Sequence, residues 1–326
     1  MCHVPCAWCW VLCHVRYVVT LRTGAAWERR GTAVRVASRF QASSSLRHVS
    51  TRHPAPGTRH STRHQAPGTW HQVAIIPLVS VPRFFAPALD AGDETVLLPK
   101  DEAEHLMRVL RLGPGDTIAI FDGRGLEFLA KVVSADRRDV RVQVLSRVEP
   151  AAEAAVPLTL VQAVLKGDKM DDIVRDAVML GVAAIQPIVT TRTEVTVAAL
   201  VRGGRLDRWK RVALASVKQS HRAVIPDIRG PLTFESWLGE PQAAATLMLV
   251  EPGAVANAEP LTTFRDQKMP SDAAIVVGPE GGWTEGECAA ARERGARIVT
   301  LGHRTLRADA VPIAAISVLQ FLWGDL

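Results

Sequence analysis

The chain has 326 residues, of which 48% are hydrophobic, so it is long and apolar enough for two ordinary domains. Its net charge of +6 is uneven: residues 1–80 hold ten Lys and Arg and a single acid, Glu28, which leaves 29 basic and 32 acidic residues in 81–326. A global basic field for nucleic-acid binding is therefore excluded for residues 81–326, where an RNA-binding surface has to be a local patch.

The cysteines are equally uneven. Four of the five lie within the first 13 residues and the fifth is Cys288, which excludes a disulfide-built core and favours a reducing compartment, here the cytoplasm. Cys6 and Cys9, with His3 and His14, offer ligands for zinc, but no second pair follows at finger-like spacing, so no metal is expected. No run of about 20 apolar residues is present, so no membrane span is expected.

Residues 1–80 are expected to be a disordered, low-complexity extension. From about 43 to 71 the chain repeats Thr-Arg-His and Ala-Pro-Gly units, which bury too little apolar surface to offset their ordering entropy. Three interpretations stay open: an Arg-rich targeting peptide, a nucleic-acid-binding arm, or an upstream extension without a role.

Residues 81–150 are expected to form a small β-barrel. Short apolar runs predict strands at 96–98, 117–121, 126–133 and 140–148. A helix is expected over 100–110, where apolar residues recur at helical spacing. The run Asp122-Gly123-Arg124-Gly125 predicts a hairpin turn between two of the strands.

Residues 151–326 alternate strands and helices. Strands are predicted at 158–164, 184–189, 244–250, 273–277 and 297–301. Helices are predicted at 168–180, 205–220, 284–294 and 310–323. Such alternation indicates an α/β domain with a mostly parallel sheet.

The clearest chemical motif follows the predicted strand 273–277. It reads Gly278-Pro279-Glu280-Gly281-Gly282 and precedes a helix, an arrangement that places a ligand-binding loop at the carboxyl end of a sheet. Phosphate-loop and dinucleotide fingerprints are absent from it, and Glu280 would repel phosphates. A plain tight turn is the alternative interpretation.

Three further motifs stand at similar junctions. Leu301-Gly302-His303-Arg304-Thr305-Leu306-Arg307 also follows a strand and precedes a helix, so it can form a second wall of the same pocket. Lys166-Gly167-Asp168-Lys169-Met170-Asp171 lies at the first strand–helix junction of the α/β region. Lys218-Gln219-Ser220-His221-Arg222 ends a predicted helix.

These four motifs, taken in the order in which they occur along the chain, resemble the family of ribosomal RNA small subunit methyltransferase E, the 16S rRNA (uracil-N3)-methyltransferases. The opening Pro82-Arg83-Phe84-Phe85 is also similar to that family, and the resemblance covers 82–326. It implies a PUA-like β-barrel, then a SPOUT methyltransferase domain, Rossmann-like and tied in a trefoil knot. It also implies S-adenosylmethionine as cofactor, 16S rRNA of the small ribosomal subunit as partner, and a homodimer. Lys218 and the run 308–312 depart from the family pattern.

The resemblance assigns candidate roles to individual residues. The cofactor pocket is expected to comprise Gly278, Pro279, Glu280, Gly281, Gly282, Leu301, Gly302 and Leu306. The candidates for contacting the reacting uracil are Arg307, Arg222 and Lys166. The candidates for holding RNA are Arg83, Lys169, Gln219 and Ser220. For each basic residue, an ordinary surface or ion-paired side chain is the alternative interpretation.

The implied reaction moves a methyl group to uracil N3 of a base flipped from its stack, which needs orientation and charge stabilisation but no metal. Two other functions stay open. One keeps the fold and acts on another rRNA or tRNA position, and the other is a non-catalytic RNA-binding assembly factor. The glycine loops favour a cofactor-binding protein over the assembly factor.

Overall fold

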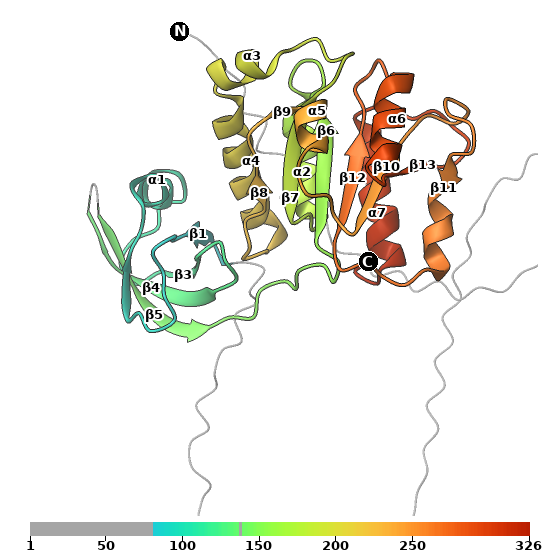
Figure 1. Cartoon of the computed structure of the whole chain (residues 1–326). Coiled ribbons are helices and arrows are strands. Elements are labelled where there is room, and N and C mark those ends of the chain that lie inside the picture. The colour runs from blue at the N-terminus through green and yellow to red at the C-terminus, as the bar shows by residue number, and fades with distance from the viewer. Residues whose placement is uncertain (1–80, 137–138) are drawn as a thin grey trace, which may run out of the picture. The chain divides into compact units, whose positions relative to one another are not determined.

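The computed structural model of the protein describes residues 81–136 and 139–326 (Figure 1). The expectations for residues 1–80, including the disorder and the zinc alternative, lie outside the described residues. Within the described part, no helix combines the length and the apolar character needed to cross a membrane.

The first sheet has five strands in the order β1-β3-β4-β5-β2. Their bounds are β1 Arg83–Phe85, β2 Thr95–Leu97, β3 Thr117–Phe121, β4 Glu127–Ala135 and β5 Val140–Arg147. Register shifts between β4 and β5, beside Ala130 and Ser134, increase the bend and twist of this sheet. Because β1 and β2 stand at its two ends, the described sheet is an open, curled half-barrel, in agreement with the predicted small PUA-like barrel.

One helical segment accompanies this sheet. The helix expected over 100–110 is α1 (Lys100–Glu104) followed by a π-helical turn, η2 (His105–Val109). Its buried residues Ala103 and Leu106 pack into the same core as Phe84 and Ile120. The small sheet therefore has a hydrophobic core of its own, as an independent layer requires.

The second sheet has eight strands, and every pairing in it is parallel. Its order is β11-β13-β10-β12-β6-β7-β8, with β9 also paired to β7. The strands are β6 Leu158–Ala163, β7 Ala184–Val189, β8 Asp227–Ile228, β9 Leu232–Thr233, β10 Ala245–Leu249, β11 Glu259–Pro260, β12 Ala273–Val277 and β13 Arg297–Thr300. All five residues of β12 are buried and apolar, as a strand covered on both faces requires.

Helices cover this sheet. They are α2 Lys169–Met179, α3 Val197–Arg202, α4 Arg205–Ser220, α5 Phe234–Leu238, α6 Glu285–Glu293 and α7 Ala310–Leu322, with a 3-10 turn, η3, at Leu261–Asp266. After β13 the chain returns across the sheet, as shown by the contacts of α7 with both α2 and the central strand β12. The predicted fold class, a small PUA-like sheet followed by a parallel α/β domain, is confirmed. The trefoil knot within it stays a prediction.

Candidate active site

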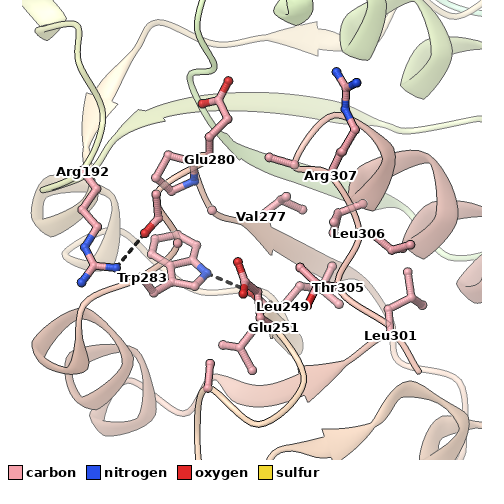
Figure 2. Close-up of a pocket in the computed structure, with 18 of the residues that line it drawn as sticks. Arg192, Leu249, Glu251, Val277, Glu280, Trp283, Leu301, Thr305, Leu306 and Arg307 are labelled. Atoms are coloured by element: carbon pink, nitrogen blue, oxygen red, sulfur yellow. Dashed lines mark hydrogen bonds between the residues drawn. The ribbon is translucent and has the colours of Figure 1, made fainter. Parts of the chain in front are cut away.

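Three loops meet at the carboxyl ends of β10, β12 and β13 and enclose a cavity of about 590 Å³ (Figure 2). The strands are parallel neighbours, so the loops that follow them gather at one edge of the sheet. Apolar side chains form much of the lining, including Leu249, Val250, Val255, Val277, Leu301 and Leu306. This size and lining are typical of a site for a small organic ligand.

The central loop, 278–284, follows β12 and depends on its glycines. A Cβ on Gly278 would lie 2.9 Å from the indole ring of Trp283, closer than real contacts allow. Gly282 has a φ of +68°, a left-handed conformation that glycine adopts without strain. Glycine at both positions is therefore a requirement of the loop's shape.

Hydrogen bonds tie this loop to its neighbours. The indole Nε1 of Trp283 donates to the carbonyl of Leu249 at 2.9 Å, and Arg192 Nη1 donates to the carbonyl of Gly281 at 2.7 Å. Glu287, the N3 residue of a capping box at the start of α6, accepts from the backbone N–H groups of Thr284 at 2.8 Å and Thr191 at 2.9 Å. The loop is thus held in place before any ligand arrives.

One side of the cavity carries the carboxylate of Glu280. Its Oε1 accepts from Lys169 Nζ at 2.8 Å and from the backbone N–H of Lys166 at 3.2 Å. Burial raises the pKa of the Glu280 carboxyl, but these hydrogen bonds outweigh burial, so its pKa lies below the ordinary value of 4.5. Glu280 is therefore an ionised, cation-paired group at neutral pH.

Arg307 occupies the same side of the cavity. Its side chain is 77% exposed, and its Nη2 lies 2.8 Å from Asp309 Oδ2. The hydrogen bond from Arg307 is the largest cause that holds the pKa of Asp309 below its usual value. In Figure 2, Arg307 and Glu280 lie on the opposite side of Val277 from Trp283 and Glu251.

The structure brings most of the predicted pocket residues together. The cavity lining includes Gly278, Pro279, Glu280, Gly281, Gly282, Leu301, Leu306, Arg307 and Lys169. Gly302 belongs to the same loop as Leu301 but is outside the lining. Lys166 lies at the edge, where its backbone binds Glu280 and its Nζ pairs with Glu194 at 2.5 Å.

Arg222 is a correction. Its guanidinium is buried and donates to the carbonyls of Val178 at 2.7 Å and Val182 at 3.1 Å, and it pairs with Glu153. Val178 is about 13 Å along α2 from the Lys169 end that borders the cavity. Arg222 is therefore committed to the interior, away from the cavity, and the predicted contact with a uracil is not available to it.

Arg83 is a second correction. Its buried guanidinium forms a bidentate pair with Glu127, at 2.8 Å for each contact. It also donates to the carbonyls of Val217 and Lys218 at 3.0 Å, which caps the end of α4. A side chain so engaged has no donor free for RNA, so the role of Arg83 is to join the small sheet to the α/β domain.

Gln219 and Ser220, the other predicted RNA contacts, lie at the same end of α4. Gln219 is exposed, and Ser220 Oγ bonds weakly to the carbonyl of Val217 at 3.4 Å. Lys218, which departs from the family pattern, pairs with the buried carboxylate of Glu102 on α1. This motif therefore forms the junction between the two sheets, away from the cavity.

Several lining residues escaped the motif analysis, among them Trp283, Arg192 and Glu251. Trp283 directly follows the glycine run, which was a usable signal. Arg192 and Glu251 follow β7 and β10 in loops without a recognisable motif. Their membership of the site depends on the strand order: β10 lies directly beside β12, and β7 lies on the other side of β12, one strand further away.

The cavity has the chemistry of a site for a nucleoside derivative without phosphate groups. Of its four acids, Glu280 and Asp309 are paired with cations. Glu251 and Glu285 have no cation partner in the described part of the chain and would disfavour a phosphate beside them, while the apolar walls suit an aromatic base. Within 81–136 and 139–326, no group of three or more His, Cys, Asp or Glu side chains is placed to hold a metal ion. The glycines allow a ligand to approach the backbone closely.

Comparison with known proteins first gives the class. The family described as RNA methyltransferase domain matches residues 152–320, and the one described as RNA methyltransferase PUA domain matches 98–145. The chain is 31% identical over 230 residues to ribosomal RNA small subunit methyltransferase E of Synechocystis, covering 71% of this chain and 74% of that relative. The chain therefore belongs to the family of ribosomal RNA small subunit methyltransferase E, as the motifs predicted.

Solved structures agree. The ribosomal RNA small subunit methyltransferase E of Neisseria gonorrhoeae, bound to S-adenosyl methionine, has a TM-score of 0.68 at 34% identity and covers 75% of this chain and 99% of its own. A putative methyltransferase from Legionella pneumophila, also in complex with S-adenosylmethionine, has a TM-score of 0.68 at 28% identity, with 76% and 99% covered.

Proposed function

We propose that this chain transfers the methyl group of S-adenosylmethionine to N3 of a uridine in 16S rRNA of the small ribosomal subunit. The observation that carries the proposal is the cavity formed by the loops after β10, β12 and β13, with its preformed glycine loop. Two relatives described as bound to S-adenosylmethionine support the choice of donor. The choice of N3 rests on the resemblance of the motifs.

The donor's requirements agree with the lining. The neutral adenine needs apolar walls, which Leu249, Val255 and Leu301 offer, and no phosphate has to be accommodated. Gly278, Gly281 and Gly282 leave backbone open to a ligand. S-adenosylmethionine supplies an already activated methyl group, so the chain's own contribution is alignment and electrostatics.

The acceptor needs help, because a neutral imide nitrogen is a poor nucleophile. Loss of the N3 proton places negative charge on the two ring oxygens of uracil. Arg307, 77% exposed at the cavity, and Lys169, beside Glu280, are the cations placed to stabilise that charge. Lys166, at the edge, is a candidate for a flanking phosphate.

The carboxylates beside these cations have an organising role. The pKa values of Glu280 and Asp309 are both lowered, so each is a weak base at neutral pH. Glu280 orients Lys169, and Asp309 orients Arg307. The two acids therefore keep their neighbouring cations aligned.

The proposal also assigns a role to each part of the chain and an oligomeric state to the protein. Residues 81–150 form an RNA-binding PUA-like domain, residues 151–326 form the methyltransferase domain, and 1–80 are dispensable. The protein acts as a cytoplasmic homodimer. Apolar Phe321, 66% exposed on α7, supports an interface on that helix. Sedimentation equilibrium tests the dimer, and a chain starting at Val81 with full activity would support the assignment of 1–80.

The central test is chemical. Nucleosides of 16S rRNA from a strain lacking the gene should lose one 3-methyluridine by mass spectrometry, and the wild-type gene should restore it. Unchanged methylation of every uridine would refute the proposal. Loss of a different methylated nucleoside would indicate another target. Calorimetry that detects no S-adenosylmethionine binding at millimolar concentration would favour an assembly factor.

A further inference from the structure

Glu251 presents an unpartnered carboxylate to the cavity. It is the second residue after β10, lines the cavity and is exposed. Within the part of the chain that the structure describes, no donor hydrogen-bonds to it and no cation pairs with it. The acids across the cavity differ, because Glu280 is paired with Lys169 and Asp309 with Arg307.

A second lining acid, Glu285, also lacks a described partner, but its setting explains its charge. It lies in the first turn of α6, where the positive end of the helix dipole stabilises a carboxylate. Glu251 has no such helix behind it, since it sits in the loop between β10 and β11. The negative charge of Glu251 therefore faces the cavity and is not stabilised by a helix dipole.

The position of Glu251 separates it from the cationic side of the cavity. Its Oε1 lies 3.9 Å from the point where a Cβ on Gly282 would stand. Arg192 Nη1 is equally far from that point, yet it donates to the carbonyl of Gly281 and forms no ion pair with Glu251 in the structure. In Figure 2, Glu251 and Trp283 lie across Val277 from Glu280 and Arg307.

The neighbours of Glu251 are apolar. Leu249 ends β10, and Val250, Pro252 and Val255 lie with Glu251 in the loop that follows; all four line the cavity. An aromatic base can be desolvated against such a wall at little cost, because its faces make no hydrogen bonds. In a nucleoside the sugar is attached directly to the base. A base packed against these apolar residues therefore places its ribose next to the carboxylate of Glu251.

The chemistry of the two groups is complementary. An ionised carboxylate only accepts hydrogen bonds, through two oxygens, and the vicinal hydroxyls of a ribose can donate two. A phosphate on the ribose would meet an unpaired negative charge. A 2′-deoxyribose would leave one carboxylate oxygen without its donor in a partly desolvated site.

We infer that Glu251 binds the 2′- and 3′-hydroxyls of the methyl donor's ribose and makes the cavity selective for an unphosphorylated ribonucleoside. This inference rests on the proposed function, since it assigns a residue to the donor's sugar. Glu251 is a specificity-determining residue. The reacting atoms lie toward Arg307 and Glu280 on the other side of the cavity.

The test is calorimetric and uses the full-length protein. The ligands are S-adenosylmethionine, 5′-methylthioadenosine and its 2′-deoxy form. Glu251→Ala should weaken the first two ligands by a similar factor, about 10- to 100-fold, because each loses charge-assisted hydrogen bonds. Wild-type protein should bind the 2′-deoxy ligand about 10-fold less tightly than 5′-methylthioadenosine, and Glu251→Ala should bind the two alike.

Glu293→Gln is the matched control, because Glu293 is an exposed acid on α6 outside the cavity. Its affinities should equal those of the wild type. If Glu251→Ala weakens S-adenosylmethionine but leaves 5′-methylthioadenosine unchanged, the carboxylate pairs with the donor's ammonium group and the inference is overturned.

The wild-type comparison stands even if a variant folds poorly. Equal binding of the ribose and 2′-deoxyribose ligands by wild-type protein would overturn the role of Glu251 while leaving the proposed function intact. Wild-type protein that binds no S-adenosylmethionine would refute the proposed function and the inference together. The two failures are therefore distinguishable.

Discussion

The indole ring of Trp283 lies 2.9 Å from the position that a Cβ on Gly278 would occupy, so only glycine fits at position 278 beside this tryptophan. The same ring donates a hydrogen bond to Leu249 and packs against Phe234, with ring centroids 5.3 Å apart. Trp283 thus connects the glycine loop to β10 and to the core behind it. Any side chain at position 278 would have to push the indole ring of Trp283 out of this position.

Gly278→Ala should therefore destabilise the protein by about 1–3 kcal/mol, the range for overpacking a tight site, and weaken S-adenosylmethionine binding at least about 10-fold. Urea unfolding and calorimetry measure the two effects. Gly286→Ala is the control, because a Cβ there meets nothing within 4 Å and alanine favours the helix. Equal behaviour of the two variants would contradict the role of Trp283.

Arg83→Ala should cost about 3–5 kcal/mol of unfolding free energy, because it leaves the buried carboxylate of Glu127 uncompensated. Arg124→Ala, which removes a guanidinium 68% exposed, should cost less than about 1 kcal/mol. Denaturant unfolding compares them. A cost for Arg83→Ala as small as that for Arg124→Ala would mean that Arg83 is not a structural element of the junction.

Alanine variants of Arg307 and Arg222 should differ in which property they lose: the rate of methyl transfer for Arg307 and the stability of the fold for Arg222. Arg307→Ala should lower the methyl-transfer rate about 100-fold, the usual scale for losing a charge-stabilising donor, with an unchanged melting temperature. Arg222→Ala should lower the melting temperature, since it removes donors from buried carbonyls of Val178 and Val182. Single-turnover kinetics and calorimetric melting distinguish them. A rate loss for Arg222→Ala without loss of stability would restore its predicted catalytic role.

The pH dependence of stability should depend on Glu280. Its native pKa is below the ordinary 4.5, so ionisation favours the folded state: the contribution is fully present above pH 4.5 and is lost as pH falls through the lower native pKa. The difference in unfolding free energy between wild type and Glu280→Gln should thus be constant at neutral pH and shrink below 4.5. A difference independent of pH would show that the carboxylate gains nothing from Lys169.

Much of the α/β domain was predictable because its strands are continuous apolar runs. The run at 273–277 coincides with β12, and the motif after it proved to line the cavity. Short elements without a strong period, such as α3 and β8, were missed, since they are stabilised by neighbours rather than by local pattern.

The site was less predictable for its basic residues. Arg83 and Arg222 were chosen because they belong to motifs, but a motif does not record burial. Both guanidiniums are satisfied by carbonyls that only the folded chain brings near. Arg307 is exposed at the cavity and Lys169 is partly exposed there, because the fold brings the segments that carry them to the carboxyl end of β12. Whether an arginine can contact a ligand depends on where the fold places its segment of backbone, and the residue type alone does not reveal this.

The place of β12 between β6 and β10 also fixes when the cavity can exist. β6 is complete at Ala163, yet its partner strand begins at Ala273. At a synthesis rate of about 5–20 residues per second, the edge of β6 waits on the order of ten seconds for β12 on the translating ribosome. Nascent chains halted before Ala273 should therefore expose an apolar strand edge to chaperones, and no methyl donor can stabilise them until the final third of the polypeptide has emerged.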